Sequence, residues 1–348
     1  MTNTTTSPEL TPTLNPADYR IRRLLPEDAV GVVACLRTIY GDSYVHTALY
    51  DPAEIIRLNE TCELVSAVAL DLTDRVVGHY ALERTSLAVI AETGVALVLP
   101  EHRHHQLMED MRLLLEKEAR QLELLGLYGN VVTNHVFTQH VVERFGERPC
   151  AISLAWSPRT FHNMPEPLPQ RMSELLYFKH LRRPAAMTVF VPTEHQLWCT
   201  RLYQQLDVDV QFGTEQPADG VTQFAVQSNP DVQRAIIRIL QVGRDLPVVL
   251  RRLMQEQQRV GAEVIFVELP LSQAATPQAC RTAEALGFGF SGIAPHFAPD
   301  GDALRLQWLA EPLDYSLIQV MNPLAQELLD YVAQEQARVN RAVLQEVE

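Results

Sequence analysis

The chain has 348 residues, a hydrophobic content of 47% and a formal net charge of −14. This length is enough for two domains with separate cores. No apolar run approaches the roughly 20 residues needed to cross a bilayer, so we expect no integral membrane protein. The acidic balance argues against non-specific binding to nucleic acid, which requires a basic face.

Residues 1–15 are rich in Thr and Pro and lack the apolar core of a secretion signal, so we expect a flexible N-terminal tail. The five cysteines are widely spaced and odd in number. They form no metal or disulfide pattern, and we expect free thiols and a cytoplasmic location.

The first half predicts an α/β arrangement. Apolar alternation, Pro and Gly breaks and acidic helix starts predict strands at 19–23, 64–70, 76–82, 87–99, 127–132 and 150–155, and helices at 29–39, 51–58, 107–125 and 137–145. The strands at 64–70 and 76–82 flank a turn-like segment and are expected to form an antiparallel hairpin.

A basic turn separates the strand at 87–99 from the long helix that follows. It contains Arg103 and the histidines 102, 104 and 105. Backbone N–H groups at a helix start lack partners and the helix dipole favours an anion, so this turn is a candidate site for a phosphate-bearing ligand. Three histidines within four positions cannot easily converge on one tetrahedral ion, so we expect no metal here.

Four prolines between Ser157 and Gln170 predict a semi-rigid linker, which we place at 159–180. The second half predicts strands at 186–191, 222–227, 235–240, 262–269, 290–294 and 303–309, and helices at 194–206, 246–260 and 277–286. The order of elements in 95–155 recurs in 235–309, which favours a duplicated α/β unit. A last amphipathic helix, 323–347, is expected either to dock on its own domain or to pair with another chain.

Each half resembles the GNAT family of N-acetyltransferases. In that family the backbone of a splayed strand takes the pantetheine arm of an acyl-coenzyme A, and a turn of pattern Q/R-x-x-G-x-G/A wraps the pyrophosphate. Arg103 matches the first position, whereas Gln106 and Met108 replace the two glycines. The resemblance implies an α/β protein with a mixed α+β sheet and two tandem GNAT-like domains, at 16–158 and 181–313. The extension 314–348 would carry the terminal helix.

The resemblance also implies roles for individual residues. Candidate coenzyme contacts are Leu97, Val98, Leu99, Arg103, His104, His105, Gln106, Leu107, Met108 and Asn134. Attack of an amine on a thioester needs a base, for which Glu92 and His79 are the candidates. Tyr40, Tyr44 and Tyr80 are candidates for binding the acceptor. Val142 occupies the position where family members often carry a Tyr that protonates the leaving thiolate.

The expected function is transfer of an acetyl group from acetyl-CoA to an amine by the N-terminal domain. The second domain would be a degenerate copy, because Asp245 and Pro247 at its helix start repel an anion and remove a donor. The alternative is a catalytically inactive GNAT-like protein that binds acyl-CoA or another small ligand as a sensor or scaffold. An acyl-CoA and an amine-bearing acceptor are the expected partners, without nucleic acid or membrane, and a homodimer is a further possibility.

Overall fold

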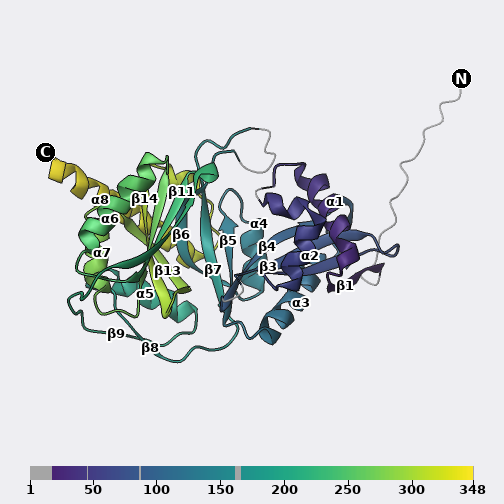
Figure 1. The fold of residues 1–348 in the computed structure, drawn as a ribbon, viewed down its shortest axis with the longest axis horizontal. Coiled ribbons are helices and arrows are strands. Elements are labelled where there is room, and N and C mark those ends of the chain that lie inside the picture. Colours follow the sequence, from purple (N-terminus) through teal and green to yellow (C-terminus); the bar gives the residue numbers. More distant parts are fainter. Residues whose placement is uncertain (1–17, 45, 86–87, 161–165, 348) are drawn as a thin grey trace, which may run out of the picture. The chain divides into compact units, whose positions relative to one another are not determined.

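A computed structural model describes residues 18–44, 46–85, 88–160 and 166–347 (Figure 1). The predicted tail, 1–15, lies outside the described residues. The chain divides into two compact units. Unit 1 comprises the chain up to Ala88 together with Thr93–Leu122, and unit 2 comprises Val89–Glu92 and the chain from Glu123 onward.

Unit 1 contains a sheet in the order β1-β2-β3-β4. Its strands are β1 (Arg20–Arg23), β2 (Leu64–Leu70), β3 (Val76–Glu83) and the later part of β4 (Ile90–Val98). Its helices are α1 (Ala29–Tyr40), α2 (Pro52–Glu60) and α3 (Leu107–Gln121), with short 3-10 turns at Pro26–Asp28, Thr47–Tyr50 and Pro100–His102. β2 and β3 form the predicted antiparallel hairpin.

Both strands of this hairpin are buried almost throughout, because α1 and α3 pack on β3 while α2 and α3 pack on β2. Because both faces are covered, the sequences of β2 and β3 are mostly apolar instead of alternating between apolar and polar residues. Helix α3 ends at Gln121, four residues earlier than predicted. Glu123 has a φ of +57°, a left-handed conformation that cannot continue a helix.

Unit 2 contains a sheet in the order β4-β5-β7-β6-β13-β14-β12-β11-β10. After the start of β4, its strands are β5 (Gly126–Val132), β6 (Arg148–Ser157), β7 (Met172–His180), β10 (Gln223–Asn229), β11 (Arg234–Gln241), β12 (Val264–Pro270), β13 (Gly289–Ala298) and β14 (Gly301–Leu309). Its helices are α4 (Phe137–Arg144), α5 (Thr193–Gln205), α6 (Leu246–Arg259), α7 (Thr276–Glu284) and α8 (Pro323–Val347). A small parallel pair joins β8 (Met187–Val189) to β9 (Val210–Phe212).

The unit 2 sheet repeats one strand order from both ends. β4 pairs with β5 in parallel, and β5, β7 and β6 follow with antiparallel pairing. β11 likewise pairs with β12 in parallel, and β12, β14 and β13 follow with antiparallel pairing. The two series meet where β6 pairs with β13. The repeated order of elements predicted from the sequence is therefore present in the strand pairing.

The prediction of a linker at 159–180 is wrong for the second part of that segment. Residues Met172–Phe178 are buried in β7, which lies between β5 and β6. The prolines that suggested a linker all precede Gln170, whereas the residues after it are mostly apolar. β9 was also not predicted.

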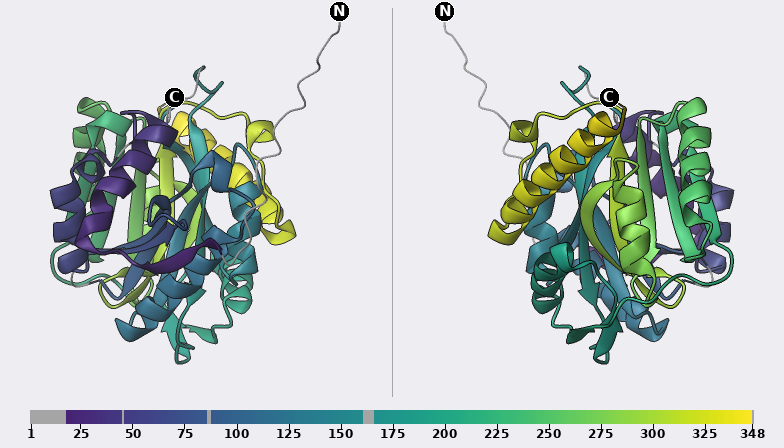
Figure 2. Two further views of the ribbon diagram at one scale, coloured as in Figure 1. Left: turned by 90° about the vertical axis from the view of Figure 1, so that its right-hand side faces the viewer. Right: turned by 90° about the vertical axis from the view of Figure 1, so that its left-hand side faces the viewer.

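Helix α8 docks on its own chain, the first of the two alternatives that its amphipathic pattern predicts. It packs on β13 and β6 (Figure 2). Leu328, Val332 and Val339 on its apolar stripe are buried. No described helix, α8 included, is both long and apolar enough to cross a membrane.

Candidate functional site

Strand β4 carries a kink next to the predicted basic turn. Val95 has a φ of +51°, which interrupts the regular strand. Its carbonyl accepts a hydrogen bond from His79 Nδ1 at 2.9 Å. His79 Nε2 lies 2.9 Å from the Ser66 hydroxyl, and the Asn59 side-chain amide donates to the same hydroxyl at 3.1 Å. This chain of hydrogen bonds within unit 1 fixes the kink.

His79, a candidate base in the sequence, is therefore buried and not open to a substrate. Its side chain is 1% exposed and both ring nitrogens have partners. Burial lowers its pKa to about 4, so it is a neutral imidazole at physiological pH. We assign it to positioning β4 and not to proton transfer from a substrate.

The basic turn has a glycine-like backbone without the glycines. Gln106, at the first expected glycine position, has φ 61° and ψ 13°, and His104 has a φ of +70°. When two left-handed residues lie on either side of a residue with ordinary φ, successive N–H groups point toward one place. Such a concavity binds anions. Within the described chain, the amides of residues 104–108 have no hydrogen-bond acceptor. This leaves them available to a ligand.

The side chains of the turn divide into exposed and buried groups. Arg103, His104 and Gln106 are exposed, and Arg103 Nε donates to the Val98 carbonyl at 3.3 Å. The His105 ring lies 5.4 Å from the Tyr19 ring. Of the other predicted coenzyme contacts in unit 1, Leu97, Val98, Leu99 and Leu107 are buried, and Met108 is half-buried. The four buried leucine and valine residues can contact a ligand only through their backbone.

The predicted acceptor-binding tyrosines are brought together only in part. The Tyr40 and Tyr44 rings lie 5.0 Å apart, and Tyr44 lies 5.6 Å from the ring of His46. Burial raises the pKa of the Tyr40 hydroxyl, while the positive charge of Arg103 opposes that rise, so this tyrosine is close to the basic turn. Tyr80 is 5% exposed on β3 and belongs to the core.

Glu92 lies in unit 2, at the last parallel pair of β4 and β5, opposite Tyr128. It is half-buried, and its Oε1 accepts a hydrogen bond from the Asn130 amide at 2.9 Å. The carboxylate is thus held in place by the neighbouring strand. Asn134 is half-buried beyond the end of β5, and its Oδ1 is buried without a partner in the described structure.

A second carboxylate near Glu92 escaped the sequence analysis. Glu174 on β7 is 5% exposed and accepts a hydrogen bond from the Ser157 hydroxyl at 2.7 Å. Burial raises its pKa to about 7; the charge of Glu92 adds to that rise, whereas Ser157 and Arg234 oppose it. Glu174 was missed because it was assigned to the linker, although the apolar residues around it are typical of a strand.

The turn in the second half, between β11 and α6, is already filled by its own chain. The Asp245 carboxylate accepts from the Thr222 amide at 2.7 Å. The Gly243 amide donates to the Thr222 hydroxyl at 3.2 Å, and the Val242 amide donates to Gln273 Oε1 at 2.9 Å. Side chains of the protein thus take the donors that a phosphate would need.

One group of described residues has the donor set of a metal site: His195, Cys280 and Glu284, all buried. Both His195 nitrogens are, however, already hydrogen-bonded, to Tyr331 at 2.7 Å and to Glu284 at 2.8 Å. The Arg338 guanidinium lies 2.7 Å from the same Glu284 oxygen. Because the hydrogen bonds of His195 are made and Arg338 already supplies a positive charge beside Glu284, this group does not need a metal ion.

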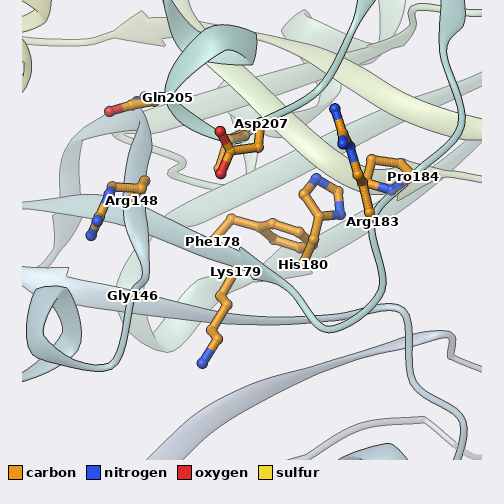
Figure 3. A pocket seen from close by; sticks show the side chains of 10 residues that line it. Gly146, Arg148, Phe178, Lys179, His180, Arg183, Pro184, Gln205 and Asp207 are labelled. Atoms are coloured by element: carbon orange, nitrogen blue, oxygen red, sulfur yellow. The ribbon is translucent and has the colours of Figure 1, made fainter.

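A cavity of about 450 Å³ opens in unit 2 at the end of β7. Figure 3 shows the Phe178 and His180 rings side by side and the Asp207 carboxylate above them. The basic side chains of Lys179 and Arg183 point in different directions, so they do not converge on one ligand. None of the predicted site residues lines this cavity.

Comparisons with known proteins gave structural matches alone. No protein-family model matches the chain, and no curated protein matches its sequence. Among solved structures it is similar to an acetyltransferase of the GNAT family from Staphylococcus aureus Mu50, with 13% identity and a TM-score of 0.37 over 47% of this chain and 99% of that one. The PaiA N-acetyltransferase of Thermoplasma acidophilum in complex with coenzyme A has 16% identity and a TM-score of 0.34, covering 47% and 98%.

Mutant forms of the spermidine/spermine N-acetyltransferase SpeG from Vibrio cholerae have 14% identity and a TM-score of 0.38, covering 47% and 95%. Each match covers about half of this chain and nearly all of the other protein.

Proposed function

We propose that the protein is an acyl-CoA-dependent N-acyltransferase that uses its N-terminal half, with acetyl-CoA as the donor and an amine as the acceptor. The observation that carries this proposal is the backbone of the basic turn. Gln106 keeps a left-handed conformation at the position where the GNAT pattern has glycine, and the amides of residues 104–108 are free of acceptors in the described chain. The turn can therefore bind a pyrophosphate through its amides and Arg103.

In this proposal Glu92 is the base. The amine nitrogen attacks the thioester carbonyl carbon, its proton passes to Glu92, and the C–S bond breaks to release the coenzyme thiolate. Asn130, which holds the Glu92 carboxylate, sets the direction of its free oxygen. An acidic protein suits a cationic amine, for which Tyr40 and Tyr44 supply an aromatic wall.

The second half fits a tandem copy, at 181–313, that binds no coenzyme. Its strand order repeats that of the first half, but its turn is filled by Asp245, Thr222 and Gln273. Such a copy would shape the protein without taking part in the reaction. We further propose that the protein is cytoplasmic.

A second candidate is a catalytically silent protein that binds acyl-CoA as a sensor. It is favoured by Val142, which stands where a Tyr would protonate the thiolate and which is 4% exposed in α4. No proton donor is available from that position. Acetyl transfer by a Val142→Tyr variant, without transfer by the wild type, would support this candidate.

Binding is tested by calorimetric titration with acetyl-CoA. Arg103→Glu is expected to weaken binding at least about tenfold, since a reversed charge beside a pyrophosphate costs more than about 1.4 kcal/mol. The matched control is Arg244→Glu, an exposed arginine in the corresponding turn of the second half, and it should leave affinity unchanged. Equal effects of the two substitutions would reject the assignment of the turn.

Activity is tested separately, with a panel of amines and detection of the free thiol. Glu92→Gln should lower kcat while acetyl-CoA affinity stays the same, because the substitution removes only the base. A Glu92→Gln enzyme with an unchanged rate would reject Glu92 as the base. Binding of acetyl-CoA without transfer to any amine would favour the sensor.

A further inference from the structure

Strand β10, at the end of the unit 2 sheet, is exposed on both faces and along its outer edge. Six of its seven residues are exposed, and the sheet order ends with it. The strand at the corresponding place in the first half is β3, which lies beside β4 as β10 lies beside β11. Seven of the eight residues of β3 are buried, and β2 covers its edge. Among the residues that the structure describes, the second half thus has no strand at the place that β2 takes in the first half.

Natural proteins protect an open strand edge with charged residues, prolines or bulges. The sequence Gln-Phe-Ala-Val-Gln-Ser-Asn of β10 contains neither charge nor proline. Its one irregularity lies between Gln223 and Phe224, and the pairing with β11 is regular from Phe224 to Asn229. An unprotected edge of this length is a template for a further strand.

The face of β10 that carries Phe224 and Val226 favours a neighbouring strand with apolar residues. Phe224 and Val226 pair with Ile239 and Ile237 of β11, which belong to the main hydrophobic core. Val226 is nevertheless 36% exposed. An added strand with apolar residues on that face would extend the core over them.

A second copy of β10 meets this requirement. A two-fold axis perpendicular to the sheet keeps each face of the strand on the same side, so a residue of one copy pairs with one of the same parity in the other. The register centred on Val226 sets Val226 against its own copy and Phe224 against Ser228. The apolar residues of both copies then form one stripe. Each chain has a formal net charge of −14, which makes two copies repel each other. Because β10 itself is uncharged, its pairing with a second β10 places no like charges opposite each other.

We propose that two copies of this protein associate through antiparallel pairing of their β10 strands, in the register centred on Val226. The interface is limited to one strand and its flanks, so the dimer fraction should rise with protein concentration instead of being obligate. This inference is independent of the proposed enzymatic activity.

The test is sedimentation velocity of the full chain from low micromolar to several hundred micromolar. Wild-type protein is expected to shift from monomer to dimer over this range. Val226→Lys places two like charges opposite each other at the two-fold axis and should raise the dissociation constant at least about tenfold. The matched control is Val248→Lys on α6, where the valine is 73% exposed, and it should dimerise like the wild type.

Thermal unfolding of both variants checks that they are folded. A wild type that stays monomeric over the whole range overturns the proposal, as does a Val226→Lys variant that dimerises like the wild type. Equal weakening by both substitutions also overturns it, because the cause would then be net charge and not the strand. Association of β10 with a different protein would appear as a monomeric wild type.

Discussion

Replacement of Glu174 by Gln should change how the stability of unit 2 depends on pH. The carboxyl group is 5% exposed, and burial is the main reason that its pKa rises from 4.5 to about 7. Between these two values the folded chain keeps a proton that the unfolded chain has lost. The free energy of unfolding therefore falls as pH rises through this window.

The size of the effect follows from the two pKa values. A difference between 4.5 and about 7 corresponds to about 3 kcal/mol, which is present below the unfolded value and lost as pH rises through the folded one. Gln resembles the protonated carboxyl and can still accept the hydrogen bond from Ser157. Glu174→Gln should thus match the wild type near pH 4 and exceed its stability by up to about 3 kcal/mol near pH 8.

Urea unfolding at a series of pH values measures the difference between the two proteins. Glu311→Gln, which neutralises an exposed carboxylate, is the control and should give a small difference at every pH. The reasoning is refuted if Glu174→Gln differs from the wild type by the same amount at pH 4 and pH 8, because burial would then not have raised the pKa.

Three other substitutions test the local structure. Gln106→Gly should stabilise the protein by about 0.5–1 kcal/mol in thermal unfolding, since Gly adopts a φ of 61° without strain, and should leave acetyl-CoA binding intact or tighter. Gly292→Ala should cost more than about 3 kcal/mol in urea unfolding, because its Cβ would lie 2.3 Å from the Cys150 carbonyl oxygen; Gly301→Ala, also at positive φ but with open space, should cost less. His79→Gln should remove a loss of stability that the wild type shows as pH falls from about 6.5 to about 4, since the folded pKa is depressed to about 4 and the unfolded chain binds the proton first.

The elements could be predicted from the sequence wherever a segment carried its own signal. Helix α2 begins after Asp51, whose side chain accepts from the Ala53 amide, and the proline that follows suits a first turn. The position of the basic turn at the start of α3 was equally local. Such signals depend on residues only a few positions apart, so they can be recognised in the sequence.

The roles of single residues within the candidate site depended on distant contacts. In the sequence His79 is a reasonable candidate base. In the structure both of its ring nitrogens are hydrogen-bonded, to Ser66 and Val95 of two other strands. Glu174 became a titratable neighbour of Glu92 only because β7 enters the sheet between β5 and β6. Neither contact leaves a pattern in the sequence, because the partners lie far apart along the chain.

The sequence by itself determined the helices, most strands, the repeated order of elements and the basic turn, since each follows from periodicity and from residues that begin or end an element. Tertiary structure decided which turn keeps its amides free, which carboxylates are buried and which strand is left at an edge. The physical reason is that hydrogen-bond satisfaction and desolvation are set by neighbours in space. The helix start of the first half keeps amides without partners in the described chain, whereas the corresponding helix start of the second half is filled by Asp245 and Thr222.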